Sequence, residues 1–435
     1  MNRTRNTIAT LLMLTLCCAD AAAQSGIYVC GYFRRNRASA VTRVRNSGYT
    51  NAILFNVDVQ EDGTLTTDYD WGNKKAAEAG GIICQDGEYV FGQYQPYYAN
   101  DIKQLLTAPT SVKRIEICIG GWGNGSYGKI KDLIKKEGTG ENSTLYKNFK
   151  ALKEAIPEIE AVNNDQEQDY DVTTAVEFHK MMYDLGYKTT IAPYMNKSYW
   201  QTLVKKVNAA RTGAVDLVYL QTYGGGAGNN PADWDFGDIP MWVGFDCESN
   251  GNLSEMQSKF SNWKDAGKVV GGFLWNYNSE ARTLNDWATA INRIFYKRSE
   301  DSAPVVAKAY SDADFGGYCV ELSEGKYCMA DLAAIGLKIN DLSSLEVTAG
   351  YKVTLYKSNS CRGTGMEFTE STNYVGDGWN DKVQSLKVES MTDGVETVNC
   401  EKTAAKGQKY NLSGQKVDDN YRGLVIVNGR IVMNN

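Results

Sequence analysis

Histidine is almost absent from this sequence: its 435 residues include one, His179. A Ser-His-Asp triad, a Cys-His pair and a histidine-rich metal site all need a suitably placed imidazole, so this scarcity argues against all three. His179 lies in TTAVEFHKMMYDLGY, a pattern that predicts an amphipathic helix ending at Gly186 with the histidine partly exposed. Any acid–base chemistry therefore falls to Asp, Glu and Tyr.

Three other features are missing. The net charge of -6 provides no basic footprint, so we expect no nucleic-acid partner. No CxxC spacing occurs, which argues against a zinc cluster. Beyond the N-terminus no stretch is apolar and long enough to cross a bilayer, so no membrane span is predicted.

The N-terminus has the pattern of a secretory signal. Arg3 and Arg5 precede an apolar run over residues 8–16, and Ala21-Ala22-Ala23 offers a small-residue cleavage site. We predict a signal peptide over residues 1–23 and a secreted protein, located at the cell surface, in the medium or in the periplasm. In such an oxidising compartment some of the eight remaining cysteines are expected to pair.

Composition and pattern predict two domains. The length suffices for more than one core, and 27 tyrosines and 9 tryptophans suit either core packing or sugar faces. Over residues 24–298, apolar runs alternate with helical patterns, which predicts the α/β class and a (β/α)8 TIM barrel. An open doubly wound sheet is the rival, but no GxGxxG follows the first strand. The predicted strands are IYVCGYF, AILFNVDV, RIEICIGGW, IEAVNNDQE, KTTIAPYM, DLVYLQTY, IPMWVGFD and VVGGFLWNY.

Polar and aromatic residues collect at the carboxyl ends of these strands, where a parallel barrel keeps its chemistry. In IEAVNNDQE the residues Asn163, Asp165 and Glu167 point to one side of the predicted strand, because side chains alternate faces. The same segment could also be a solvated loop. Other strand ends supply aromatic candidates, namely Trp122, Tyr194, Tyr223 and Trp275.

The C-terminal part changes character. A charged linker is predicted over residues 299–308, followed by an internal repeat over residues 309–390. Two similar halves of short strands and polar turns predict a small all-β Greek-key domain. Residues 391–435 form a short β-rich tail that resembles the sorting modules of secreted bacterial proteins.

The barrel segments resemble glycoside hydrolase family 18, the chitinases and endo-β-N-acetylglucosaminidases. That family's DGxDxDxE strand stands here as residues 160–167, with Glu160 and Asn163 in two of its Asp places. ICIGGW (117–122), VDLVYLQTYGGG (215–226) and GGFLWNY (271–277) resemble three further strands of the family.

The resemblance implies substrate-assisted retaining hydrolysis of a β-linked N-acetylglucosamine bond, in an N-glycan core or a chitin-like polymer, with no catalytic cofactor. Glu167 would be the acid and base, Asp165 would hold the acetamide, and Tyr223 would donate to it. The implied substrate-binding residues are Asn163, Gln221, Trp275, Trp122 and Tyr194. Asn163 cannot share a proton, so we expect its amide to bond Asp165 and to weaken catalysis.

Two alternatives remain open at this stage. A catalytically impaired, lectin-like barrel would grip a glycan in the same groove without cleaving it, and Glu160, Asn163 and Gly224 favour that reading. A structural surface protein is the other alternative, in which Asp165 and Glu167 are ordinary loop carboxylates.

The repeat resembles a βγ-crystallin domain, a family whose N/D-N/D-x-x-S/T-S loops bind calcium. INDLSS (339–344) and NDKVQS (380–385) match that pattern with one departure each. The resemblance implies a Ca²⁺ site with Asp341, Ser344, Asp381 and Ser385 as candidate ligands. Tight-turn chemistry alone is the alternative, because Asn, Asp and Ser favour turns.

Overall fold

The computed structural model describes residues 24–30, 37–67, 81–247, 252–266, 269–277, 284–298, 302–391, 408–411, 414–418, 420–427 and 430–434. The predicted signal peptide and residues 299–301 of the predicted linker lie outside this range. The chain divides into two compact units, Met1–Ser390 and Met391–Asn435.

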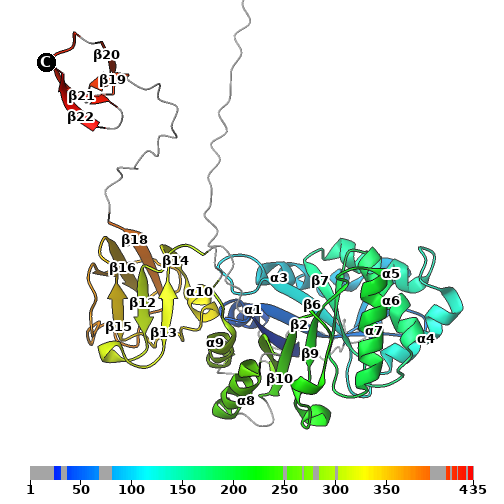
Figure 1. Ribbon diagram of the computed structural model, residues 1–435. Helices are drawn as coiled ribbons and strands as arrows, with labels where there is room; N and C mark the ends of the chain where they lie inside the picture. Colours follow the sequence, from blue (N-terminus) through cyan, green and yellow to red (C-terminus); the bar gives the residue numbers. More distant parts are fainter. Residues whose placement is uncertain are drawn as a thin grey trace, which may run out of the picture. The chain divides into compact units, whose positions relative to one another are not determined.

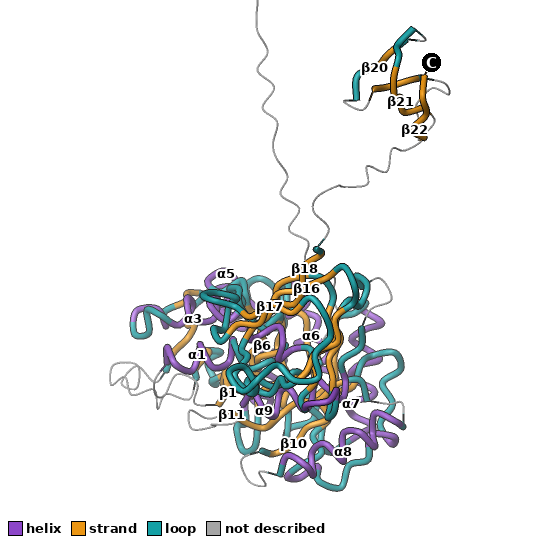
Figure 2. Tube along the Cα trace, turned by 90° about the vertical axis from the view of Figure 1, so that its left-hand side faces the viewer, coloured by secondary structure: helices purple, strands orange, loops and turns teal. Residues whose placement is uncertain are grey.

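Eight parallel strands close into a barrel within the first unit (Figures 1 and 2). Their order is β1-β11-β10-β9-β8-β7-β6-β2, and pairing of β2 with β1 closes the ring. The α/β class and the closed parallel ring are thereby confirmed, and the open doubly wound sheet is excluded. The strands are β1 (Ser25–Cys30), β2 (Asn51–Val59), β6 (Arg114–Gly120), β7 (Ile159–Asp165), β8 (Lys188–Ile191), β9 (Val215–Leu220), β10 (Met241–Asp246) and β11 (Gly271–Tyr277).

Helices cover the outside of the ring (Figure 1). Three of them begin where the sequence supplies a polar cap: the side chains of Ser143, Asp171 and Asn252 each accept a hydrogen bond from the backbone N–H three residues on. The helices are α1 (Arg37–Arg45), α3 (Tyr98–Leu105), α4 (Ser126–Glu137), α5 (Thr144–Ala155), α6 (Val172–Asp184), α7 (Lys197–Ala210), α8 (Leu253–Asp265) and α9 (Leu284–Phe295).

Two connections depart from regular strand–helix alternation. After β2 the chain forms short antiparallel strands, the first of which pairs with β2 and the others with one another. Between β9 and β10, where every residue from 221 to 240 is described, it forms two 3-10 helices and no α-helix, because GGGAGNNP is poor in helix formers. The eightfold (β/α) repeat therefore fails at this connection. The added elements are β3 (Leu65–Thr66), β4 (Ile82–Gln85), β5 (Glu88–Tyr89), η1 (Phe91–Gln93), η2 (Gly224–Gly226) and η3 (Pro231–Asp233).

The barrel strands are buried on both faces. Their outward side chains pack against the helices, while an inner cluster fills the ring, with Tyr28, Ile53, Tyr219, Trp242 and Phe273 among its members. Burial on both faces explains why these segments read as nearly continuous apolar runs.

Residues 307–390 form a second, all-β part of the first unit, here called the sandwich domain. Its two sheets, β13-β12-β15 and β14-β18-β16-β17, share one apolar core. The predicted small all-β domain is confirmed, and its first strand starts two residues before the predicted boundary. Its elements are β12 (Ala307–Tyr310), η4 (Ala313–Phe315), β13 (Cys319–Leu322), β14 (Gly325–Tyr327), α10 (Met329–Ala334), β15 (Ser344–Val347), β16 (Tyr351–Tyr356), β17 (Met366–Phe368) and β18 (Ser385–Ser390).

The two halves of the sandwich domain exchange strands. β14 comes from the first half but pairs with β18 of the second half. In return, Thr372 of the second half forms a bridge with Leu345 on β15 of the first half. Each sheet therefore contains residues from both repeats.

Helix α9 joins the barrel to the sandwich domain. The Asn292 amide donates to the carbonyl oxygens of Gly48 (2.8 Å) in the barrel and Ala333 (2.9 Å) on α10. The Arg293 guanidinium lies 3.3 Å from the centroid of the Tyr318 ring, a cation–π contact.

The second unit is a small antiparallel sheet of order β20-β19-β21-β22. Its strands are β19 (Lys409–Asn411), β20 (Lys416–Val417), β21 (Gly423–Val427) and β22 (Arg430–Asn434). Across the described residues of the whole chain, no helix combines the length and apolar character that a bilayer span requires.

Candidate functional site

A cavity of about 590 Å³ opens at the carboxyl ends of the barrel strands. Seven of the eight barrel residues predicted from the sequence line it: Asp165, Glu167, Tyr223, Gln221, Trp275, Trp122 and Tyr194. The remaining lining residues are Phe55, Gly121, Gly224, Gly225 and Asp246. The cavity therefore draws on seven of the eight strands or the loops that follow them.

Glycines bring the third and fourth strands of the ring together beside the carboxylates. Gly120 pairs with Asp165 across β6 and β7, and a Cβ at Gly120 would lie 2.2 Å from the Asp165 carbonyl oxygen. A Cβ at Gly121 would lie 2.9 Å from the Phe55 ring. Both glycines have a positive φ, so the GG of ICIGGW is required by backbone conformation and by space.

Asp165 and Glu167 form the acidic centre of the cavity. Asp165 is 3% exposed, and its Oδ1 accepts a hydrogen bond of 2.9 Å from the Gln221 amide. Burial and then the neighbouring Glu167 raise the pKa of Asp165 well above its ordinary range. Burial also raises the pKa of Glu167, and an interaction with the Gln221 amide partly opposes both shifts. The pair therefore keeps a proton to higher pH than two isolated carboxyls would.

Tyr223 is held as a hydrogen-bond donor. Burial raises the pKa of its hydroxyl well above the ordinary value, and the charges of Asp165, Glu167 and Asp246 raise it further. A hydroxyl among three carboxylates stays protonated and has acceptors or a ligand to donate to. Gly244 makes room for the ring, because a Cβ there would lie 2.5 Å from it.

Aromatic rings form one wall of the cavity. Trp275 stacks on Tyr223 with centroids 6.5 Å apart and planes 19° apart, and it meets Phe55 edge-on at 4.9 Å. Both Phe55 and Trp275 precede a cis peptide bond. Trp122 is 84% exposed at the mouth, so it offers a free aromatic face.

Asn163 lies beneath the cavity and does not line it. Its side chain is 0% exposed, its Oδ1 accepts from the Tyr28 hydroxyl (2.8 Å), and its Nδ2 donates to Thr190 Oγ1 (2.8 Å). The predictions that Asn163 contacts substrate and that its amide bonds Asp165 are therefore wrong. Its role is to position Tyr28, whose ring centroid lies 5.4 Å from that of Trp275.

The outward residues of the same strand explain the rest of its polar run. The Asn164 amide meets His179 Nε2 on α6 at 2.9 Å, and the Tyr199 hydroxyl on α7 donates to Gln166 Oε1 at 2.6 Å. His179 is 1% exposed, contrary to the expected partial exposure, and burial lowers its pKa to about 3. It is a neutral structural histidine.

A second buried carboxylate, Glu116 on β6, lies away from the cavity. It accepts hydrogen bonds from Thr190 (2.6 Å) and Tyr219 (2.9 Å) and forms an ion pair with Arg114 (2.8 Å). Arg114 also makes a bidentate pair with Asp216 at 2.8 and 2.9 Å. Burial raises the pKa of Glu116, and Arg114, Thr190 and Tyr219 oppose the shift.

Ser344 and Ser385, two of the predicted calcium ligands, are fully buried in matching turns. The Ser344 hydroxyl donates to the Asp312 carbonyl (2.6 Å) and accepts from the Phe315 N–H (3.1 Å). Ser385 bonds Ser358 and Cys361 in the same way, at 2.6 and 2.7 Å. Each hydroxyl thus donates one hydrogen bond and accepts one, and the two serines mark the internal repeat.

The two predicted aspartates differ from each other. Asp341 accepts a hydrogen bond of 2.6 Å from the Tyr318 hydroxyl, whose ring packs on Arg293. Asp381 is exposed, has a φ of 54°, and accepts from the neighbouring Asn380 amide. Within the described parts of the chain, no three His, Cys, Asp or Glu side chains converge as a metal cluster.

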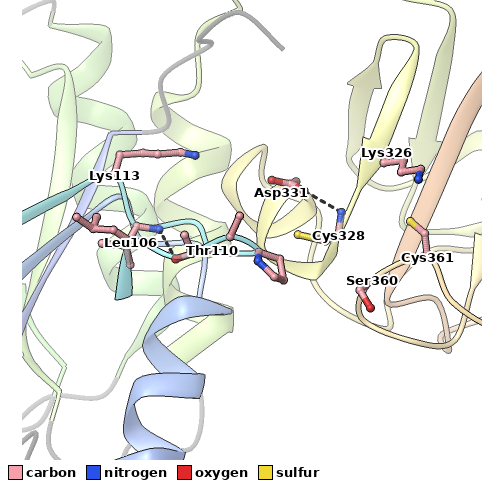
Figure 3. Close-up of a pocket in the computed structure, with 11 residues that line it drawn as sticks. Leu106, Thr110, Lys113, Lys326, Cys328, Asp331, Ser360 and Cys361 are labelled. Atoms are coloured by element: carbon pink, nitrogen blue, oxygen red, sulfur yellow. Dashed lines mark hydrogen bonds between the residues drawn. The ribbon is translucent and has the colours of Figure 1, made fainter. Parts of the chain in front are cut away.

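A second pocket of about 590 Å³ lies between residues 106–113 of the barrel and the sandwich domain (Figure 3). Cys328 and Cys361 line it as free thiols, and the Cys328 N–H donates to Asp331 (2.8 Å). Cys84, Cys118, Cys319, Cys328 and Cys361 are free thiols, so the expected pairing is not seen among these five, and Cys400 lies outside the described residues.

Sequence reasoning missed Phe55 and Asp246 at the cavity. Both lie towards the carboxyl ends of strands that were predicted, AILFNVDV and IPMWVGFD. Applying the strand-end rule to every strand, and not only to those with a motif, would have found them.

Comparison with known proteins finds relatives for part of the chain. No family model matches the chain. Development-specific protein S of Myxococcus xanthus and its homolog are each 34% identical to it over 82 residues, which are 19% of this chain and 47% and 46% of those proteins. The chain therefore spans about half the length of these curated relatives.

Solved structures match a similar share of the chain. A βγ-crystallin domain from Flavobacterium johnsoniae is 31% identical, with 20% of this chain and 98% of that one covered and a TM-score of 0.20. The N-terminal domain of protein S is 33% identical, with coverages of 20% and 96% and a TM-score of 0.19. Over about a fifth of its length, the chain is therefore similar to protein S and to βγ-crystallin domains, with about a third of the residues identical.

Proposed function

We propose that this protein hydrolyses a β-linked N-acetylglucosamine bond, in an N-glycan core or a chitin-like polymer, at the barrel cavity. The observation that carries the proposal is the pair Asp165 and Glu167, two residues apart at the end of β7 in one cavity and both with a raised pKa. Such shifts in a cleft are typical of acid–base sites. The resemblance of the strand motifs to glycoside hydrolase family 18, a TIM-barrel family, supports the same reading.

In the proposed reaction the substrate's own acetamido oxygen attacks the anomeric carbon as the glycosidic C–O bond breaks. Glu167 gives its proton to the departing oxygen. Water then attacks the same carbon, Glu167 accepts a proton from it, and the oxazolinium ring opens. This is the substrate-assisted exception to the two-carboxylate mechanism.

The surrounding residues stabilise the charged intermediate. Asp165 accepts from the acetamide N–H and faces the developing positive charge, while the Gln221 amide fixes its carboxylate. Tyr223 donates to the acetamide oxygen, since its hydroxyl stays protonated. Trp275 offers its face to the sugar ring, and Trp122 and Tyr194 extend the binding surface.

A glycan-binding barrel without hydrolysis is the second candidate, and one observation favours it. Both side-chain groups of Asn163 are committed to Tyr28 and Thr190, so no titratable group on β7 stands beneath Asp165. Proton sharing from below is absent along this described strand, and the cavity would then only bind.

The test is incubation with a high-mannose glycoprotein and with chitooligosaccharides, read by mass spectrometry. We expect cleavage that falls about 10²–10⁴-fold in Glu167→Gln. Glu160→Gln, on the same strand but outside the cavity, is the matched control and keeps the activity. Binding of sugar without cleavage by the unmodified protein would instead establish the second candidate.

We further propose that the sandwich domain binds calcium at its second loop. The exposed carboxylate of Asp381 beside Asn380 fits a hard cation that prefers oxygen ligands. Asp341 fits poorly, because Tyr318 occupies its oxygen next to the Arg293 cation. Calcium should raise the melting temperature, Asp381→Asn should abolish the rise, and Asp341→Asn should retain it. An equal loss in both variants would contradict this assignment.

The N-terminal pattern leads us to propose that the protein is secreted. Mass spectrometry of the mature N-terminus tests this, with Gln24 expected as the first residue. An intact Met1 in the extracellular fraction would contradict a cleaved signal.

A further inference from the structure

The cavity contains a third carboxylate that the proposed reaction does not use. Asp246 ends β10 and lines the cavity, and its Cα pairs in register with that of Trp275 on β11. It therefore lies beside the aromatic wall on which a sugar ring would stack. Its charge also reaches Tyr223, whose pKa it raises.

All the charged side chains among the described residues that line the cavity are acidic. Its lining contains Asp165, Glu167 and Asp246, and none of the described residues that line it is Lys, Arg or His. Inside a partly enclosed space such charges are screened less than on an open surface. An anionic ligand would therefore meet repulsion, and an ammonium group would meet attraction.

The wall next to Tyr223 leaves space for a ligand substituent. A Cβ at Gly224 would meet no atom within 4 Å, whereas one at Gly225 would lie 2.8 Å from the Tyr194 ring. The third carboxylate whose charge acts on Tyr223 comes from the next strand, β10.

We propose that Asp246 is a specificity-determining residue that makes this cavity favour amino sugars with a free ammonium group, and neutral sugars, over sugars with an anionic substituent. The proposal rests on the proposed function for the location of the sugar, but not on cleavage. It gives the substrate class as N-acetylglucosamine polymers that are neutral or partly deacetylated, and it excludes sulfated or carboxylated ones.

Equilibrium binding in the Glu167→Gln background tests this without turnover. The probes are fully acetylated chitotriose, chitotriose with one free amine, and 6-O-sulfated chitotriose, followed by calorimetry at low salt. We expect affinity to fall in the order amine, acetylated, sulfated. Adding Asp246→Asn should reduce the preference for the amine over the sulfate by about tenfold, and high salt should reduce it in the same direction.

Asp238→Asn, an exposed residue of the connection before β10, is the control for net charge and should leave the preference unchanged. The inference is overturned if Asp246→Asn and Asp238→Asn behave alike, or if none of the three sugars binds. Ordered binding in the Glu167→Gln variant together with no cleavage by the unmodified protein would support the inference and refute the hydrolase. Cleavage with no charge preference would do the reverse.

Discussion

The barrel contains two groups of buried carboxylates, Glu116 and the pair Asp165 and Glu167. The two groups differ in their hydrogen-bond and charge partners. Glu116 has a cation, two hydroxyl donors and a second ion pair behind its cation. Among the described residues, Asp165 and Glu167 have one amide donor between them, from Gln221, and the lining of their cavity has no cation. All three pKa values are raised, because all three groups lose water.

The difference shows how to distinguish a buried carboxylate that stabilises the fold from one that serves a ligand. A carboxylate whose oxygens are all satisfied by the protein contributes to the fold and has nothing left for a ligand. A carboxylate pair left with spare acceptors costs stability, and that cost is explained if a substrate supplies the missing donors. The next four predictions test this contrast.

The largest expected effect is that of Asp165→Asn. We expect hydrolysis to fall about 10²–10³-fold, because the neutral amide no longer stabilises the positive charge that develops on the oxazolinium ring. The free energy of unfolding at pH 8 should stay level or rise, because a neutral amide replaces a poorly partnered buried acid. Steady-state kinetics and urea unfolding measure the two quantities. A variant that loses stability as well as activity would show that Asp165, like Glu116, contributes to the stability of the fold.

Glu116→Gln should show the opposite behaviour. The amide cannot accept from both Thr190 and Tyr219 and leaves Arg114 with less counter-charge, so we expect a loss of about 3 kcal/mol in urea unfolding. Glu160→Gln is the control: Glu160 also approaches Arg114, at 3.4 Å, but is 51% exposed. Its loss should be below about 1 kcal/mol. Equal losses of unfolding free energy in the two variants would contradict the distinction between the buried Glu116 and the exposed Glu160.

His179 is a buried base, and the pH dependence of stability tests its burial in the same way as that of the carboxylates. Its folded pKa of about 3 lies below the ordinary 6.5, so the unfolded chain binds the proton first as pH falls. The histidine's contribution is complete above pH 6.5 and is lost as pH drops towards 3. Between pH 7 and pH 5 the native protein should lose about 2 kcal/mol that His179→Gln does not lose. Parallel pH profiles for the two proteins would contradict a buried neutral imidazole.

The pair Asp165 and Glu167 should give the smallest effect. Its contribution to stability should change with pH in the direction opposite to that of His179. Because the folded pKa values are raised, the folded state binds protons more tightly, and stability falls as pH rises above about 4. From pH 4.5 to pH 8 the native protein should lose more stability than Asp165→Asn, by on the order of 1 kcal/mol. Urea unfolding at both values measures it, and an identical fall would show that the pair titrates normally.

Much of the barrel could be predicted from local pattern. Each of the eight apolar runs became a strand, because a strand buried on both faces must be apolar along its length. Seven cavity residues followed from one rule, that parallel strands present their carboxyl ends at one face. The glycine-rich stretch after β9 was read as part of a regular repeat, although its composition disfavours a helix.

Long-range partners could not be predicted. Asn163 was assigned to substrate because it shares a strand face and a motif with Asp165, but its partners are Tyr28 and Thr190, 135 and 27 residues away. Ser344 and Ser385 were assigned to calcium from a motif, and their hydroxyls also donate to backbone carbonyls of distant turns, which the motif does not reveal. Hydrogen-bond capacity is finite, and which group uses it is decided by the tertiary fold.

The exchange of β14 and Thr372 between the halves of the sandwich domain has a consequence for its ancestry. A single half would expose unpaired strand edges, which invite association with another copy. An ancestral half-length gene would thus have encoded a peptide that needed a twin, and fusion of two copies would have turned that dimer into one chain. Cutting the chain after residue 348 should leave two fragments that assemble with each other through these strand edges.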